Sequence, residues 1–255
     1  MMNNRMILTP FFLDQVVPDL EGLTSEDWWS NKPELAQGEA QERMVVLYRP
    51  LAEMVKTAVQ AGERPVSVAG DCCTTIGVLA GLQQAKLNPT LIWFDAHGDF
   101  NTWTTTPSGF LGGMPLAMLV GLGDQTMGQG VGLTSLPEPQ VVLTDARDLD
   151  PGERDNVERS AIIHLADVSM LLEYPLPAGP LYVHFDADVI NKEDAPAMNY
   201  PTEGGPSPAV LGRAFDRLAD SGRVAAVSLS TWNPALDVDG RSREVVMSLL
   251  GRLIR

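Results

Sequence analysis

The chain has 255 residues, of which 44% are hydrophobic and 20% are charged, and its formal net charge is −15. This composition is typical of a globular protein, and the length suits one large α/β domain. The negative charge argues against nucleic acid and anionic membranes as main partners, because phosphate groups repel acidic surfaces.

We expect a cytoplasmic location. The two cysteines, Cys72 and Cys73, are adjacent, so no disulfide framework is expected and a reducing compartment fits. We find no signal-peptide pattern at the N-terminus and no apolar run that approaches the length of a membrane span.

Strand-length apolar runs alternate with helix-forming segments along the chain. From the N-terminus the predicted elements are strand 5–9, helix 34–61, strand 66–70, helix 74–87, strand 90–94, a short helix ending at 120, strand 140–143, strand 161–165, strand 181–185, helix 210–221, strand 224–230 and helix 243–254. Residues 11–33 are expected to be irregular and to cover the edge of the site or a neighbouring subunit, and the Gly-rich segment 121–139 is expected to be a surface excursion. The alternation predicts a single three-layer α-β-α domain over residues 1–255 with a mostly parallel sheet.

Three acidic or imidazole side chains, Asp95, His97 and Asp99, follow the predicted strand 90–94. Alternation along an extended strand end would place all three on one side. Carboxylates together with a neutral imidazole suit a divalent cation. The alternative is a strand end that turns into an ordinary polar loop.

Two further strands end in ligand-type residues. Asp186 and Asp188 follow strand 181–185, and Cys72 follows strand 66–70. The carboxyl ends of parallel strands meet at one edge of a sheet, so these side chains are expected at one site. Carboxylates this close would repel each other without a cation, and five or six ligands favour two bridged metal ions.

The same residues resemble the arginase (ureohydrolase) family. Four blocks carry the resemblance: residues 95–102 resemble D-A-H-x-D-x-N-T, residues 108–115 resemble S-G-N-L-H-G-x-P, residues 147–153 resemble R-D-V-D-P-G-E, and residues 185–188 resemble F-D-x-D. Several blocks in the same order make the resemblance specific, and it covers most of the chain from Val66 to Asp237.

The resemblance implies a pair of divalent ions, usually manganese, and attack of a metal-bridging hydroxide on a guanidino carbon. It implies these ligands: Asp95 and Asp186 as bridges, His97 and Asp188 for one ion, and Asp99 and Cys72 for the other. His97 and Asp99 are also the residues predicted to be catalytic. Family members are often trimers or hexamers, so a homo-oligomer is expected.

The resemblance also implies a substrate that is a small α-amino acid. Asn101 and Ser108 match residues that hold the substrate carboxylate, and Asp150 and Glu153 match acids that receive its α-amino group. The alternative for the two acids is a turn that caps a helix. Phe110 stands where the family has Asn, so carboxylate recognition departs from the family pattern.

Two departures concern the metals and the proton. Cys72 stands where the family has a metal-binding histidine, and a thiolate prefers zinc, iron or nickel over manganese. The alternative is a buried, inert thiol with one metal lost. Gly112 replaces the histidine that shuttles protons. His184 is expected to point elsewhere rather than to replace it, and His164 is expected to be a core or strand-end histidine.

The third departure concerns the substrate head group. Aligning Asn233 and Pro234 with the family's E-x-N-P places Thr231 at the glutamate that pairs with the guanidinium. A neutral hydroxyl cannot offset a buried cation as a carboxylate does. The less basic N-hydroxy-arginine is therefore as strong a candidate substrate as arginine, and the products would be ornithine with hydroxyurea or urea.

The leading interpretation is thus a metal-dependent amidinohydrolase that acts on an arginine-like amino acid. Two alternatives stay open. One is a hydrolase of another amidine or amide, and the other is a catalytically impaired binding or regulatory protein.

Overall fold

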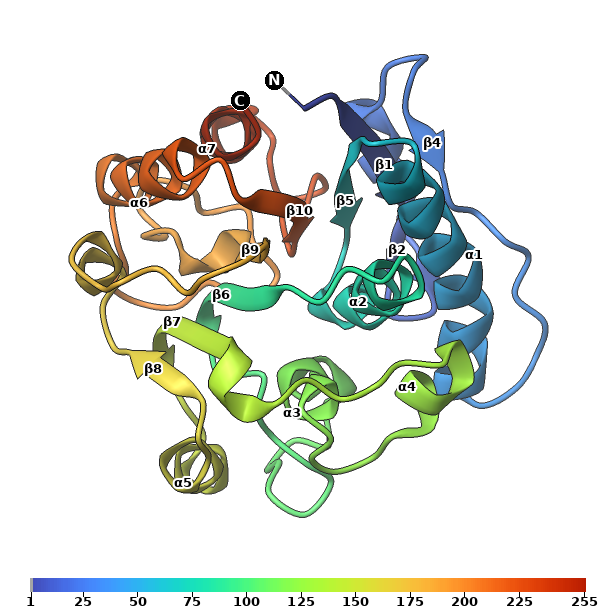
Figure 1. Cartoon of the computed structure of the whole chain (residues 1–255), viewed down its shortest axis with the longest axis horizontal. Helices are drawn as coiled ribbons and strands as arrows, with labels where there is room; N and C mark the ends of the chain where they lie inside the picture. Colours follow the sequence, from blue (N-terminus) through green and yellow to red (C-terminus); the bar gives the residue numbers. More distant parts are fainter. Residues whose placement is uncertain (1) are drawn as a thin grey trace.

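The computed structural model describes residues 2–255. At its centre lies an eight-stranded sheet with the order β4-β1-β5-β10-β9-β6-β7-β8, in which neighbouring strands are parallel (Figure 1). Its strands are β1 Asn4–Thr9, β4 Trp29–Ser30, β5 Arg64–Ala69, β6 Thr90–His97, β7 Val141–Asp148, β8 Ile163–Leu165, β9 Leu181–Asp186 and β10 Val224–Ser230. A separate antiparallel pair consists of β2 (Phe11–Phe12) and β3 (Gln15–Val16).

Helices cover both faces of the sheet. They are α1 Ala40–Gln60, α2 Thr75–Gln84, α3 Pro115–Leu119, α4 Thr126–Val131, α5 Pro151–Arg159, α6 Pro208–Asp220 and α7 Arg241–Leu253. Short 3-10 turns occupy Pro18–Leu23, Cys72–Thr74, Leu111–Gly113, Glu138–Gln140, Val168–Leu172 and Ala187–Val189. Figure 1 shows α1 and α2 on one face and α6 and α7 on the other, which confirms the predicted three-layer α/β fold.

Successive side chains of β6 are buried alternately in two hydrophobic cores. Leu91 and Trp93 are buried in the core under α1 and α2, whereas Ile92 and Phe94 are buried in the core under α6 and α7. A strand that is buried on both faces has an unbroken apolar sequence, and β6 begins with such a run. The central strands thereby form a rigid support for the residues that follow them.

The structure corrects the prediction in three segments of the chain. The first long helix begins at Ala40 rather than at residue 34. Residues 11–33 are not wholly irregular, because they include β2, β3, a 3-10 turn and the edge strand β4. The Gly-rich segment 121–139 contains α4, whose Met127 and Val131 are buried one turn apart in the core that α1 also joins. Tertiary packing there outweighs the low helix propensity of glycine.

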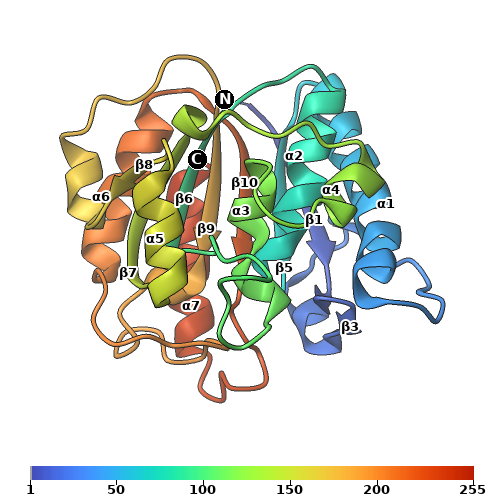
Figure 2. The ribbon, with the colours of Figure 1, turned by 90° about the horizontal axis from the view of Figure 1, so that it is seen from below.

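The loops that follow the sheet strands gather along the lower edge of Figure 2. Two of the residues at this edge, Asp99 and Thr231, have the positive backbone φ angles of 49° and 65°. Such conformations are strained for residues other than glycine and tend to occur at functional sites. Among residues 2–255, no helix combines the length and the apolar character needed to cross a membrane.

Candidate metal and substrate site

A cavity of about 170 Å³ opens at the carboxyl edge of the sheet. All eleven residues predicted for the site line it: Cys72, Asp95, His97, Asp99, Asn101, Ser108, Asp150, Glu153, Asp186, Asp188 and Thr231. Phe12 lines it too, so the N-terminal segment does cover the edge of this cavity, as predicted. The topology therefore brings together residues that are as far apart in the sequence as positions 72 and 231.

Side-chain atoms of metal-ligand type form two groups at the cavity, and the groups share Asp95. The thiol cluster consists of Cys72, Asp95, His184 and Asp186, and the His97 cluster consists of Asp95, His97 and Asp188. Within each cluster one ligand atom from every residue lies within 4.8 Å of the others. Two neighbouring groups with one shared carboxylate suit two bridged cations.

The pairing of β6 with β7 is irregular beside the His97 cluster. The register shifts between Asp95 and His97, and the extra residue lies in β7. Asp95 Oδ1 accepts a hydrogen bond from the His97 backbone N–H at 2.7 Å. The His97 ring then turns its Nδ1 toward Asp188 Oδ2, at 3.1 Å, and Asp95 Oδ1, at 3.4 Å. Asp99 lies beyond the end of β6, so simple alternation does not place all three residues as predicted.

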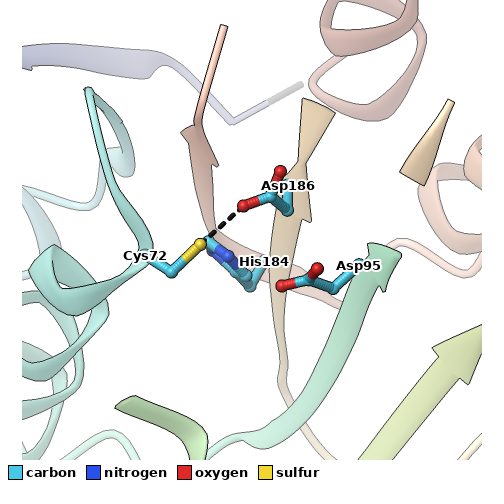
Figure 3. Close-up of side chains that lie close together, drawn as sticks. All are labelled: Cys72, Asp95, His184 and Asp186. Atoms are coloured by element: carbon cyan, nitrogen blue, oxygen red, sulfur yellow. Dashed lines mark hydrogen bonds between the residues drawn. The ribbon is translucent and has the colours of Figure 1, made fainter. Parts of the chain in front are cut away.

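Asp186, at the end of β9, is hydrogen-bonded to Cys72 within the thiol cluster (Figure 3). Its Oδ2 accepts hydrogen bonds from Cys72 Sγ at 2.6 Å and from Ser230 Oγ at 3.1 Å, and its Oδ1 accepts one from Thr231 Oγ1. Within residues 2–255 both cysteines are free and buried, as expected. The Cys72 thiol therefore faces the cavity from the margin of the core under α1 and α2.

Burial and mutual repulsion disfavour the charged forms of the clustered carboxyl groups. Burial and the neighbouring Asp188 raise the pKa of Asp186 to about 7, and burial and Asp186 raise the pKa of Asp95. Burial and Asp95 raise the pKa values of Asp99 and Asp188 in the same way.

Two other groups in the cavity are set by the clustered carboxyl groups and by burial. Burial opposes the charged form of His97, but its hydrogen bonds to Asp188 and Asp95 outweigh that effect and raise its pKa to about 12. Asp99 Oδ2 is buried and has no hydrogen-bond partner among the described residues. Buried oxygens, an imidazole and a thiol that crowd one another are a donor set that fits divalent cations.

Glu153 ties the loop after β6 to the start of α5. Its Oε1 accepts from the Phe100 backbone N–H at 2.8 Å and its Oε2 accepts from the Asp150 backbone N–H at 3.1 Å. Glu153 thus caps α5, as the helix-capping alternative for the two acids expects, and burial raises its pKa to about 7. Asp150 still faces the cavity and accepts a hydrogen bond from Asn101 Nδ2 at 2.9 Å.

Phe110 explains the glycine at position 112. A Cβ atom on Gly112 would lie only 2.3 and 2.4 Å from two carbons of the Phe110 ring. That ring stacks on Phe12 at a centroid distance of 6.3 Å and leans on Tyr200 at 5.2 Å, and all three rings line the cavity. The two departures from the family pattern at positions 110 and 112 are therefore physically coupled.

His184 is the site residue that sequence reasoning missed. It was expected to point elsewhere, and this was wrong, because residues 184 and 186 on β9 are two positions apart and so share a face of the sheet. Burial lowers the pKa of His184 to about 3, so its ring is neutral. His164 lies half-buried in the middle of the short strand β8, outside both clusters, with its Nε2 2.9 Å from the Asp145 carbonyl oxygen.

Comparisons with known proteins agree with this geometry. The sequence model of the arginase family matches residues 23–254. An arginase of Bacillus subtilis (strain 168) is 33% identical over 218 residues, in an alignment that covers 79% of this chain and 74% of that protein. The N(omega)-hydroxy-L-arginine amidinohydrolase of Streptomyces lavendulae is 29% identical over 228 residues, with 88% of this chain and 78% of that protein covered.

Solved structures give the same result. The crystal structure of arginase from Bacillus subtilis matches with a TM-score of 0.83 and 26% identity over 99% of this chain and 98% of that one. The native structure of arginase from Bacillus caldovelox matches with a TM-score of 0.81 and 26% identity over 100% and 98%. Since the family model matches almost the whole chain, and the residues at its centre form the cavity described above, the protein belongs to the arginase family.

Proposed function

We propose that the protein is an amidinohydrolase that cleaves the guanidino-type C–N bond of an arginine-like α-amino acid. Water adds to the guanidino carbon, the bond from that carbon to the side-chain nitrogen breaks, and ornithine leaves together with urea or hydroxyurea. One observation carries the proposal. A single cavity is lined both by residues of the metal-type clusters and by the polar pair of Asn101 and Asp150.

The ligands proposed for two divalent ions are Cys72, Asp95, His97, Asp99, Asp186 and Asp188. Ions bound there would lower the pKa of water and supply a nucleophile near neutral pH. Manganese is the ion that the resemblance implies, and zinc, iron or nickel would suit the thiol better. Asp99 and His97 stay the proposed catalytic residues, and the buried, unpartnered oxygen of Asp99 supports a role in direct contact with an ion or with water.

Asn101, Ser108, Asp150 and Glu153 are the residues proposed to bind the amino-acid end of the substrate. Asp150 supports this role because its carboxylate faces the cavity beside the Asn101 amide. Glu153 would act by positioning, because both of its oxygens accept backbone N–H groups. It holds Asp150 and the loop that carries Asn101 in place.

Thr231 favours N-hydroxy-arginine over arginine as the substrate. Its hydroxyl lines the cavity and donates to Asp186, so it offers the head group no negative charge. A charged hydrogen bond contributes about 1.5–3 kcal/mol, and its absence penalises the strongly basic guanidinium more than the weakly basic N-hydroxyguanidine. The name of the Streptomyces lavendulae relative supports the same preference.

The test is a comparison of kcat/KM for the two substrates with metal-loaded protein. We expect the native chain to favour N-hydroxy-arginine and Thr231→Glu to shift the ratio toward arginine by about 10- to 150-fold, the equivalent of one charged hydrogen bond. Thr231→Gln is the matched control, because it has a similar size without the charge. Efficient hydrolysis of arginine at neutral pH by the native chain, with no turnover of the hydroxylated form, would show that the argument from Thr231 is wrong.

A second candidate is a catalytically impaired binding protein. The observation that favours it is the Phe110 ring over Gly112, which fills the space of the family's proton-shuttling histidine. This candidate predicts no release of urea, of hydroxyurea or of the product of any other amidine from a metabolite panel. A melting temperature that manganese and zinc leave unchanged would support it further, because a bound ion stabilises the folded state.

A further inference from the structure

We propose that His184 is a metal ligand, and that it completes a zinc-type site with Cys72, Asp95 and Asp186. The resemblance to arginases assigns no role to this histidine. The inference rests on the proposed function only in that the cavity binds metal, and it does not depend on which substrate is cleaved.

The four side chains of the thiol cluster converge from three parts of the sheet (Figure 3). His184 and Asp186 come from β9, Asp95 comes from β6, and Cys72 begins the turn between β5 and α2. Their donor atoms lie within 4.8 Å of one another. In a tetrahedral site with bonds of about 2.0–2.3 Å, donor atoms are about 3.3–3.8 Å apart, so movements of roughly 1 Å suffice to bind an ion.

Ser230 gives a second measure of this convergence. Its hydroxyl oxygen lies 3.2 Å from Cys72 Sγ, 3.1 Å from Asp186 Oδ2 and 3.4 Å from His184 Nε2. One small group therefore touches three of the four donors at once. The thiol, the carboxylate and the imidazole thus face the same Ser230 hydroxyl, which agrees with the convergence of their donor atoms.

The His184 ring is also oriented as a ligand needs to be. Its Nδ1 lies 2.8 Å from Ser228 Oγ, and that oxygen lies 2.8 Å from the Tyr182 hydroxyl. The ring packs on Trp93 at a centroid distance of 3.9 Å. A hydrogen bond at one ring nitrogen fixes the direction of the other, which is the usual support of a ligating histidine. Nε2 is left to face the cluster.

The donor set decides which ion fits. One sulfur, one nitrogen and two carboxylate oxygens form a borderline-soft set that favours zinc over manganese. The His97 cluster has no sulfur and is harder. The two positions therefore differ in chemistry, and we expect the thiol cluster to keep zinc under conditions in which the ion at the His97 cluster exchanges with manganese.

Metal affinity of purified variants provides the first test, with zinc as the probe and a chromogenic chelator as competitor. Loss of a supporting partner weakens a metal site by about 10- to 100-fold. We expect that loss for Ser228→Ala, and a larger loss for His184→Gln. His164→Gln is the matched control, since it changes a strand histidine outside the clusters. Native-like zinc affinity in folded His184→Gln would overturn the proposal.

Cobalt spectroscopy of the native chain gives a test that needs no variant to fold. The sequence has only three histidines, so selective labelling of the imidazole nitrogens yields few NMR signals. With cobalt bound at both clusters, two strongly shifted imidazoles are expected, from His97 and His184. One shifted imidazole, assigned to His97, would overturn the proposal, whereas two shifted imidazoles without any turnover of substrate would contradict the proposed reaction alone.

Discussion

The contact between Gly112 and Phe110 leads to a prediction about stability. The φ angle of Gly112 is not positive, so the backbone conformation itself allows a side chain at this position. The ring of Phe110 excludes a side chain there because it occupies the space. A new Cβ would lie 2.3 Å from a ring carbon, whereas carbon atoms pack at about 3.5–4.0 Å. Gly112→His must therefore push the ring off Phe12 and Tyr200. Overpacking of this kind costs about 1–3 kcal/mol.

Thermal unfolding of metal-free protein is the assay. At about 2–4 °C per kcal/mol for a chain of this size, Gly112→His should lower the melting temperature by about 2–12 °C. Gly113→His is the matched control, because a Cβ there meets only Asn101 Nδ2, at 4.0 Å. Adding Phe110→Asn removes the clash, so the double variant should recover about 0.5–3 kcal/mol relative to the sum of the single changes.

The same pair of changes predicts activity. Only the double variant has room for an imidazole at position 112, so only it should gain a proton donor, which is typically worth about 10²- to 10⁴-fold in turnover of arginine. The reasoning is refuted if Gly112→His alone is as stable as the native chain and the two substitutions are additive.

Three further predictions concern the carboxyl groups and the loop that carries them. Asp186→Asn should abolish metal binding and turnover, and metal content per chain checks it; retained activity would contradict the site. Gly98→Ala should destabilise the chain by about 1–3 kcal/mol in chemical denaturation, because its Cβ would meet Leu149 at 2.5 Å and Glu153 at 2.7 Å; an unchanged midpoint would refute this. With the pKa of Glu153 raised from 4.5 to about 7 and that of Asp71 raised from 3.8 to about 6, these two groups together bind more protons in the folded chain than in the unfolded chain across that range. Metal-free protein should therefore lose stability as the pH rises from about 4 to 7, and greater stability in chelator at pH 8 than at pH 5 would argue against it.

The sequence by itself determined the layers of the fold and the family. Short continuous apolar runs such as the one that ends at Phe94 are typical of strands covered on both faces, and their alternation with helices predicts a parallel sheet. Because parallel strands end at one edge, the order of the chain alone assigns the residues after them to one site. The cavity at that edge contains Asp95, Asp186 and Cys72, as this argument requires.

Only the tertiary structure determined which groups contact each of these residues. Periodicity gives the face on which a side chain lies, but the partner across the sheet or from a loop depends on register and on packing between distant segments. The Phe110 ring lies against Gly112. Glu153 caps α5 and also accepts a hydrogen bond from the Phe100 backbone N–H. His184 meets Cys72, 112 positions earlier in the chain, because β10 joins β5 to β9 and so brings the end of β5 close to His184.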